Sequence, residues 1–509
     1  MTDESKDRVE HFDVLVVGAG LSGVGAGYYL KTRCPNKRFA IFEARSAVGG
    51  TWDLFRYPGI RSDSDMFTLG YAFKPWLEAK AIADGPSILK YVNETAAECG
   101  IDKLIRLEHR VTLAAWNTAD ARWAVDVEVG QAKTPKRVTC NFLHMCAGYY
   151  NYARGYRPHF DGEESFRGPI VEPQFWPADL DFVGRRVVVI GSGATAMTLV
   201  PAMAETAAHV TMLQRSPTYV VSRPAEDAFA NALRTYLPSK LAYAIVRWRN
   251  VLLGMWFFNY ARKKPAKVKA GIVDMVRKEL GPDYDLGTHF TPRYNPWDQR
   301  LCLVPDADLF KSIKSGKTSV VTDAIDRFTA DGIALKSGRT LPADIVVAAT
   351  GLDMQLMSGL DVRVDGAQVN FADVFAYKGM MYSGVPNLSS TFGYTNASWT
   401  LKADLTAQYL CRLLNYMDRH AYVECRPAND DPGLKATPWL DFSSGYVQRA
   451  IAKMPKQGDH APWKVHQNYA LDLLAFRYGK LDDGVMKFFG RGEAVHAVPP
   501  TRELAPAAE

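Results

Sequence analysis

The first part of the chain alternates between short apolar runs and longer stretches in which apolar residues recur at helical spacing. Val14–Val17 is apolar and rich in β-branched residues, which is typical of a strand buried on both faces of a sheet. A helical pattern follows from about Ser22 to Lys31, and a second apolar run, Arg38–Phe42, comes after it. Strands that alternate with helices in this way predict a parallel sheet in an α/β fold.

The same alternation restarts further along the chain. Arg186–Ile190 predicts a buried strand, a helix extends to about Ala204, and His209–Leu213 predicts the next strand. Each copy is followed by shorter runs that predict a β-meander: Ile105–Leu113, Trp123–Val129 and Arg137–Cys146 after the first, and Ser319–Val321, Arg327–Ala330 and Gly332–Leu335 after the second. Because 509 residues exceed what one hydrophobic core can hold, we expect two Rossmann-like domains.

A glycine-rich turn follows the first strand. Gly18, Gly20 and Gly23 stand at GxGxxG spacing, which permits a tight turn, lets the backbone approach a pyrophosphate, and lets the helix pack close to the strand. Glu43 directly follows the second strand, where an acceptor for ribose hydroxyls belongs. A carboxylate there repels a 2′-phosphate but accepts hydrogen bonds from a free ribose. This site therefore suits FAD.

The second copy has a related turn with a different ending. Gly191, Gly193, Thr195 and Ala196 lie in the sequence GSGATA, in which alanine replaces the third glycine, and we expect them to hold a second pyrophosphate. Arg215 directly follows the next strand, where a guanidinium can pair with a 2′-phosphate. Thr218 is expected to assist Arg215. The second site therefore suits NADPH.

The two dinucleotide units are predicted to be interleaved along the chain. The strand Asp344–Ala349 ends in the turn Thr350-Gly351, where we expect the chain to return from the second unit to the first. The predicted division is an FAD-binding domain in residues 1–150 and 350–509 (with the C-terminal region), an NADP-binding domain in residues 151–226 and 285–349, and a basic helical insertion in residues 227–284.

The insertion differs from the rest of the chain in composition. Lys and Arg are frequent between residues 234 and 278, and Asn250–Ala261 within it carries no charge. Such a basic, aromatic-rich segment is too short to span a bilayer, but it can lie in the interface plane. Two interpretations stay open: a helical cover over a substrate pocket, which we favour slightly, and a peripheral contact with a membrane.

Composition excludes several other classes of protein. The formal charge of +6 is small for this length and does not indicate nucleic-acid binding. Seven scattered cysteines form no CxxC pair, which favours a reducing cytoplasm and argues against a disulfide reductase. The polar N-terminus and the absence of an 18-residue apolar run predict neither a signal peptide nor a membrane span. The scattered histidines predict no metal site.

Two further stretches carry a resemblance to a known family. Gly49–Asp63 reads GGTWDLFRYPGIRSD and fits the pattern G-G-x-W-x4-Y-P-G-x3-D. Phe166–Trp176 reads FRGPIVEPQFW and is similar to the signature F-x-G-x3-H-x3-W. With the dinucleotide motifs, these stretches resemble the class B flavoprotein monooxygenases of the Baeyer–Villiger type, in particular the subgroup of ethionamide-activating and long-chain alkane monooxygenases.

One position departs from the signature. Glu172 stands where the family has a histidine, in the linker between the two nucleotide domains. In the family this histidine is thought to aid domain movement and not to perform the oxygen transfer. Because a carboxylate lacks the switchable charge of an imidazole near neutral pH, the substitution bears more on turnover rate than on the chemistry.

The resemblance implies an oxidoreductase that uses NADPH, FAD and O2 to insert one oxygen atom into a ketone, with sulfoxidation as a side activity. A C4a-peroxide of the flavin would attack the carbonyl, stabilised by a fixed positive charge. Arg300 matches the family arginine that supplies this charge, and Asp63 matches the carboxylate that orients it. The resemblance also places Gly49, Gly50, Thr51 and Trp52 along the flavin, and Asp53 near it.

Two alternatives to this function stay open. The first is a related flavin monooxygenase that oxidises nitrogen, sulfur or alkanes, which a real divergence at Glu172 would favour. The second is a non-catalytic flavoprotein or a membrane-surface binding module built on the basic helices, which NADPH-dependent bleaching of the flavin would exclude. The expected substrate is a small apolar ketone or sulfide.

Overall fold

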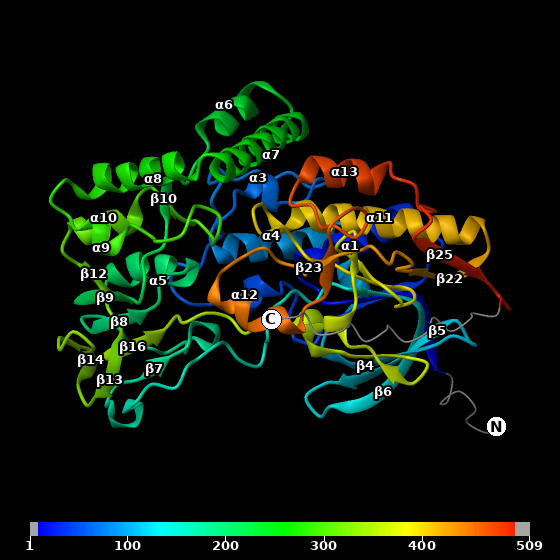
Figure 1. The fold of residues 1–509 in the computed structure, drawn as a ribbon, viewed down its shortest axis with the longest axis horizontal. Helices are drawn as coiled ribbons and strands as arrows, with labels where there is room; N and C mark the ends of the chain where they lie inside the picture. The colour runs from blue at the N-terminus through cyan, green and yellow to red at the C-terminus, as the bar shows by residue number, and fades with distance from the viewer. Residues whose placement is uncertain (1–8, 494–509) are drawn as a thin grey trace.

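The computed structural model describes residues 9–493, in which a larger mixed sheet and a smaller parallel sheet lie side by side, each with its own helices (Figure 1). The larger sheet has nine strands in the order β18-β17-β4-β5-β6-β1-β2-β3, with β21 paired to β6. Its parallel part is made of β1 (Glu10–Val17), β2 (Phe39–Phe42), β3 (Ile105–Arg106), β6 (Thr134–Met145) and β21 (Leu388–Ser390). The GxGxxG turn thus follows a central strand, as the apolar run predicted.

The meander and a late segment of the chain complete this sheet. The strands β4 (His109–Asn117), β5 (Arg122–Val129) and β6 pair antiparallel. The late strand β17 (Asp361–Val364) pairs with β4, and β18 (Ala367–Gln368) pairs with β17. The predicted run Ile105–Leu113 is wrong as a single strand, because its first two residues form β3 beside β2, a turn follows, and only its last five residues belong to β4.

The smaller sheet is parallel throughout, in the order β12-β9-β8-β16-β7. Its strands are β7 (Ile170–Val171), β8 (Arg186–Ile190), β9 (His209–Gln214), β12 (Thr318–Thr322) and β16 (Ile345–Ala348). The second predicted meander is corrected in one respect: Ser319–Val321 lies in β12, a parallel partner of β9. The meander itself consists of β13 (Ile325–Thr329), β14 (Gly332–Leu335) and β15 (Thr340–Pro342).

Helices cover both sheets. The helices that follow the glycine turns are α1 (Leu21–Arg33) and α5 (Ala194–Ala204), and α11 (Trp399–Arg419) packs against α1. Other helices of the described chain are α2 (Thr51–Leu54), α3 (Met66–Leu69), α4 (Gly85–Glu98), α9 (Leu286–His289), α10 (Asp308–Lys314), α12 (Gly445–Ala450) and α13 (Tyr469–Arg477). The segment Pro499–Glu509, whose composition predicts a disordered tail, lies outside the described residues.

The region between residues 227 and 284 is helical, as its composition predicted. It contains α6 (Ala228–Tyr236), the 25-residue α7 (Ser239–Lys263) and α8 (Pro265–Leu280). Figure 1 shows α6 and α7 at the top of the molecule, above α3 and near α13, and α8 beside the smaller sheet. The insertion therefore contacts both halves of the molecule.

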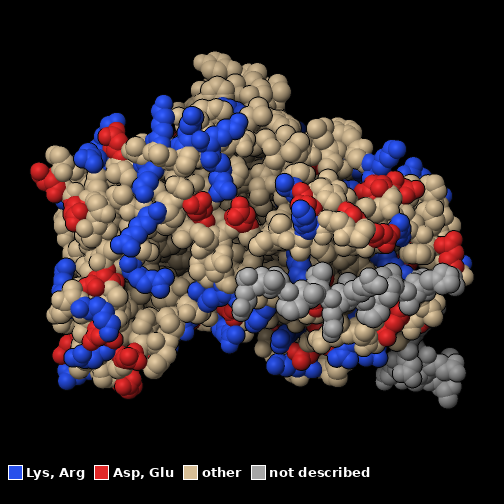
Figure 2. All heavy atoms as spheres, in the orientation of Figure 1, with Lys and Arg blue, Asp and Glu red and all other residues tan. Residues whose placement is uncertain are grey.

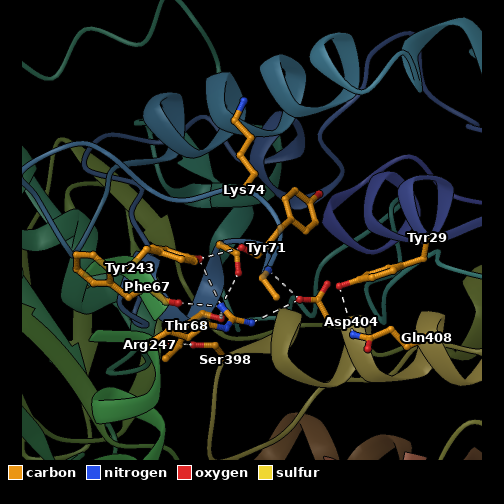
Figure 3. Close-up of polar contacts among 12 residues, drawn as sticks. Tyr29, Phe67, Thr68, Tyr71, Lys74, Tyr243, Arg247, Ser398, Asp404 and Gln408 are labelled. Atoms are coloured by element: carbon orange, nitrogen blue, oxygen red, sulfur yellow. Dashed lines mark hydrogen bonds and ion pairs between the residues drawn. The ribbon is translucent and has the colours of Figure 1, made fainter. Parts of the chain in front are cut away.

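A buried arginine anchors α7 to the larger sheet's helices (Figure 3). Arg247 is 7% exposed, and its Nη1 donates to the carbonyl oxygens of Phe67 and Gly70, each at 2.7 Å. Its Nη2 lies 3.5 Å from Oδ2 of Asp404 on α11. Carbonyls at the end of a short helix such as α3 lack partners within the helix, so the guanidinium satisfies them while its charge is balanced by Asp404.

A second charged cluster joins three strands of the larger sheet. The Glu10 carboxylate at the start of β1 accepts hydrogen bonds from Arg106 on β3, at 2.6 and 2.7 Å, and from Lys136 on β6, at 3.2 Å. These bonds, chiefly those from Arg106, lower the pKa of Glu10 to about 2. A carboxyl group with a lowered pKa stabilises the fold above its unfolded pKa, and this contribution is lost as the pH falls towards 2.

We therefore expect Glu10→Gln to lower the free energy of unfolding at pH 7 by about 1 kcal/mol, since the cluster is partly exposed to water. The difference between wild type and variant should shrink as the pH falls from about 4.5. Urea unfolding of both proteins at several pH values measures it. A difference that stays constant with pH would contradict an electrostatic origin.

Candidate active site

A large cavity lies between the two sheets, with a volume of about 1260 Å³. Residues that follow β1, β2, β8 and β9 line it, namely Gly18, Glu43, Gly191 and Arg215. The carboxyl ends of parallel strands from both sheets thus face one space, where ligands of open α/β sheets bind. The volume exceeds the roughly 300–1,000 Å³ of a pocket for one small ligand, which suits two dinucleotides.

The first glycine turn is sterically required. Gly18 has φ +103°, and an added Cβ would lie 2.6 Å from the carbonyl oxygen of Cys146. A Cβ on Gly23 would lie 1.8 Å from the carbonyl oxygen of Gly18, so this glycine lets α1 pack against β1. Gly18 and Gly20 line the cavity, whereas Gly23 is buried behind them. The tight turn and the close packing of the helix agree with the spacing, and the approach to a pyrophosphate stays a prediction.

The Glu43 carboxylate is held in place by backbone donors. Its Oε2 accepts from the N–H of Ala19 at 2.7 Å, and its Oε1 accepts from the N–H of Arg45 at 2.9 Å. Burial raises the pKa of Glu43, and these two donors oppose the rise. Each oxygen keeps a further lone pair for a ribose hydroxyl. Since Glu43 lines the cavity, this geometry fits the adenosine part of FAD.

The segment after Gly49 forms another part of the cavity wall. Gly50 has φ +56°, and it lines the cavity together with Thr51 and Trp52. Asp53 does not line it; this residue is 5% exposed and pairs with Arg45 and with Arg56, the latter at 2.7 Å. Asp53 therefore fixes Arg45, which itself lines the cavity.

The second glycine turn leaves open space at the start of α5. Gly191 has φ +136°, and its added Cβ would lie 2.3 Å from the carbonyl oxygen of Ala349. In contrast, a Cβ on Gly193 would meet no protein atom within 4 Å, so nothing inside the protein requires glycine there. A helix N-terminus left bare in this way suits a pyrophosphate. Thr195 also lines the cavity, and Ala196 is buried behind it.

Arg215 lies at the cavity rim after β9. Its side chain is exposed, and no carboxylate of residues 9–493 forms an ion pair with it. Nearby, the hydroxyls of Ser192 and Thr218 lie 3.0 Å apart, and both residues line the cavity. An unpaired guanidinium beside two hydroxyls fits a 2′-phosphate.

The structure brings Arg300 and Asp63 together, although they are far apart in the sequence. Nε of Arg300 lies 3.1 Å from Oδ2 of Asp63, and both residues line the cavity. The Asp63 carboxylate raises the pKa of Arg300, so the guanidinium stays charged at every working pH. The neighbouring Cys302 is buried, and burial raises the pKa of its thiol to about 12. This cysteine is therefore a neutral wall residue.

Sequence reasoning missed several parts of this site. Tyr149 and Tyr446 line the cavity near Arg300. Tyr149 lies in a loop, and Tyr446 lies in the short helix α12. Arg61 lines the cavity and pairs with Asp308 of α10 at 2.5 Å, which ties the first family motif to the smaller sheet. In retrospect, Arg61 stands inside the predicted motif GGTWDLFRYPGIRSD, and this position could have drawn attention to it.

Glu172 lies where the chain crosses between the sheets. It follows β7, and its Oε2 is 3.4 Å from the position that a Cβ on Gly155 would occupy. The second crossing runs beside the first, because the Tyr156 N–H donates to the Gly351 carbonyl at 3.1 Å and the Thr350 hydroxyl donates to the Tyr156 carbonyl at 2.6 Å. Glu172 therefore borders both crossings and lies outside the cavity lining.

The chain is similar to flavin-dependent monooxygenases over nearly its whole length. An NAD(P)-binding Rossmann-like domain model matches residues 16–77, and a flavin-binding monooxygenase-like model matches residues 80–259. The FAD-containing monooxygenase EthA of Mycobacterium tuberculosis (strain ATCC 25618 / H37Rv) is 53% identical over 95% of this chain and 98% of its own length. The probable FAD-binding monooxygenase AlmA of Acinetobacter baylyi (strain ATCC 33305 / BD413 / ADP1) is 48% identical over 96% of this chain and 98% of its own length.

Solved structures of Baeyer–Villiger enzymes share the fold. An oxidised steroid monooxygenase bound to NADP superposes with a TM-score of 0.72 at 22% identity, covering 94% of this chain and 99% of that one. The open structure of a cyclohexanone monooxygenase superposes with a TM-score of 0.74 at 17% identity, covering 95% of this chain and 100% of that one. These similarities confirm the predicted α/β fold with two dinucleotide-binding units.

The chain therefore belongs to the FAD-containing monooxygenase family. Within that family, the relatives named EthA and AlmA define the subgroup that the sequence motifs indicated. The predictions of a monooxygenase and of FAD and NADP as its cofactors are confirmed. Among the helices of residues 9–493, none combines the length and the apolar content that crossing a bilayer requires. The same residues contain no group of three or more His, Cys, Asp or Glu placed to hold a metal.

Proposed function

We propose that this monooxygenase inserts one atom of O2 into ketones to give esters or lactones, with NADPH as reductant, and that it also oxidises sulfides. The observation that carries the proposal is the Arg300–Asp63 pair at 3.1 Å in the cavity between the two glycine turns. A fixed cation in a site shielded from water stabilises an anionic oxygen nucleophile and the oxyanion that forms as it attacks a carbonyl.

The residues of the chain then have distinct tasks. The FAD is proposed to lie on the first glycine turn with its ribose on Glu43, and along Gly50, Thr51 and Trp52; when bound and reduced, it supplies the activation of O2. Asp63 holds the guanidinium of Arg300 in one orientation. Asp53 fixes Arg45 at the cavity wall. Arg300 acts in this proposal as a fixed cation and not as an acid, because its raised pKa keeps the guanidinium protonated.

The NADPH is proposed to lie on the second glycine turn. Gly191, Gly193 and Thr195 would face its pyrophosphate, Ala196 would back them, and Arg215 with Thr218 would face the 2′-phosphate. This placement is supported by the open space at Gly193 and by the exposed Arg215 guanidinium at the cavity rim.

Product analysis tests the proposed reaction. Purified protein is incubated with NADPH, O2 and either a linear ketone or an alkyl sulfide, and the products are identified by mass spectrometry. The proposal expects an ester from the ketone and a sulfoxide from the sulfide. Sulfoxide without ester would overturn ketone oxidation and favour the sulfur-oxidising alternative, to which Glu172 in place of histidine gives some support.

Replacing Arg215 tests the assignment of the second dinucleotide. We expect Arg215→Ala to raise KM for NADPH by about 30- to 100-fold, because a charge-assisted pair with the 2′-phosphate contributes about 2–3 kcal/mol. KM for NADH should change little, since NADH lacks that phosphate. Arg186→Ala, on an arginine paired with Asp344 away from the cavity, is the matched control. Equal effects on both nucleotides would contradict the assignment.

A further inference from the structure

The helix α7 has one buried face and one exposed apolar face. The buried face includes Tyr243, Arg247 and Val251, which pack towards α3 and α11. On the opposite face, large apolar side chains recur at helical spacing and are 39–62% exposed: Leu241, Ile245, Trp248, Leu252 and Trp256. Because Arg247 is tied to Asp404 and to three backbone carbonyls of residues 67–70 (Figure 3), α7 cannot turn this apolar face inward.

The neighbouring helix α13 extends the same surface. The Trp248 and Tyr469 rings lie with their centroids 5.8 Å apart, which places the two helices side by side. From α13, Leu471 and Leu474 are 48% and 57% exposed, and Tyr478 just after it is 73% exposed. We call these eight exposed residues (Leu241, Ile245, Trp248, Leu252, Trp256, Leu471, Leu474 and Tyr478) the α7–α13 face. Contiguous exposed apolar surfaces of this kind mark contact with a membrane or another protein.

Positive charge lies at both ends of α7, and negative charge is absent from this helix. The 25 residues of α7 include no Asp or Glu. Lys240, Lys263, Lys264 and Lys267 are exposed and form no ion pair with any carboxylate of residues 9–493. Figure 2 shows the top of the molecule, formed by α6 and α7, without Lys or Arg, and a group of Lys and Arg below it near the start of α8.

We propose that the α7–α13 face docks the protein peripherally on a bilayer of anionic phospholipid. The apolar residues would enter the boundary between headgroups and acyl chains, with Trp248 and Trp256 in the region that tryptophan prefers. The four unpaired lysines would lie against anionic headgroups. This proposal goes beyond the oxygenation proposed above and does not depend on it.

Charge favours a bilayer over a second copy of the chain. A two-fold dimer through this face would bring the same cationic edge of both copies to one interface, and like charges there oppose association. An anionic surface instead attracts that edge and receives the apolar residues.

Vesicle flotation tests the docking with the full-length, FAD-loaded protein. One set of vesicles contains phosphatidylglycerol and phosphatidylcholine, and the other contains phosphatidylcholine alone. We expect the wild-type protein to float with the anionic vesicles. Leu252→Gln/Trp256→Gln should lower its partition coefficient about tenfold, because both changes remove apolar area that the lipid would bury. Leu107→Gln/Val183→Gln, at exposed residues (38% and 64%) outside the α7–α13 face, is the matched control and should bind as wild type does.

Charge and oligomer measurements complete the test. Lys263→Gln/Lys264→Gln/Lys267→Gln should reduce binding to the anionic vesicles and leave binding to phosphatidylcholine unchanged. NADPH oxidation by each variant verifies that it folds. Wild-type protein that fails to float with anionic vesicles overturns the proposal, as does equal loss in the matched control. A dimer in sedimentation that Leu252→Gln/Trp256→Gln dissociates, without vesicle binding, would assign the face to a second copy.

Discussion

Arg300→Ala is expected to abolish ester formation from ketones, by at least about 100-fold, while NADPH oxidation continues. Removing one preorganised group that stabilises a developing anion costs about 10²–10³ in rate, and the Arg300 guanidinium, 3.1 Å from Asp63, is a cation held in the cavity that suits this task. Hydride transfer to the flavin does not require an anion to form on the substrate, so electrons should pass to O2 and appear as hydrogen peroxide.

Parallel assays of NADPH absorbance, ester and peroxide measure this uncoupling. Arg300→Lys keeps the charge but not the fork that pairs with Asp63, and it should retain part of the ester formation. Ester formation by Asp63→Asn should lie between that of Arg300→Ala and that of Arg300→Lys, because this change leaves Arg300 charged but no longer held in one orientation. Full ester formation by Arg300→Ala would remove the proposed role of this residue.

The second large effect is on stability. Arg247→Met is expected to lower the free energy of unfolding by about 3–5 kcal/mol, because it leaves the Asp404 carboxylate buried without its counter-charge and leaves carbonyls of α3 without a donor. Burial raises the pKa of Asp404 to about 6, and Arg247 opposes that rise. In the variant the pKa is therefore higher still.

The raised pKa of Asp404 determines how the free energy of unfolding of Arg247→Met changes with pH. The folded state of the variant binds a proton that the unfolded state has released, so its stability falls as the pH rises above the unfolded pKa. Urea unfolding should therefore show a smaller loss at pH 5 than at pH 8. Arg247→Met/Asp404→Leu should recover part of the loss, since no charge is then buried alone. Lys278→Met, in an exposed pair with Asp274, should change stability by less than about 0.5 kcal/mol.

Local patterns made the two glycine turns and the residues that follow the next strands predictable. The strand before Gly18, the turn itself and Glu43 after the next strand lie within about thirty residues, so their geometry follows from the spacing. The same holds for Gly191 and Arg215. The strand β12 was misjudged because a short apolar run carries no sign of which partner it joins, and only the completed sheet places it beside β9.

Features that depend on long-range packing could not be predicted from the sequence. The pairing of Arg300 with Asp63 could be expected only from a family resemblance, because no local pattern joins residues so far apart. In the basic insertion, Arg247 resembles its exposed neighbours in sequence, yet it alone is buried against Asp404. Tyr446 lies in α12, a helix of six residues, and so short a segment gives no sequence pattern that predicts its place in the cavity wall.

The interleaving of the two sheets has a consequence for how the chain folds as it is synthesised. Every strand of the five-stranded sheet lies between Ile170 and Ala348, whereas the nine-stranded sheet needs β17 and β21, and its helix α1 needs α11 as a packing partner. On the ribosome, the smaller sheet is complete while the larger one, begun first, still lacks the strands β17, β18 and β21. Because domains generally fold as units during synthesis, the half of the protein that starts the chain is the last to be finished.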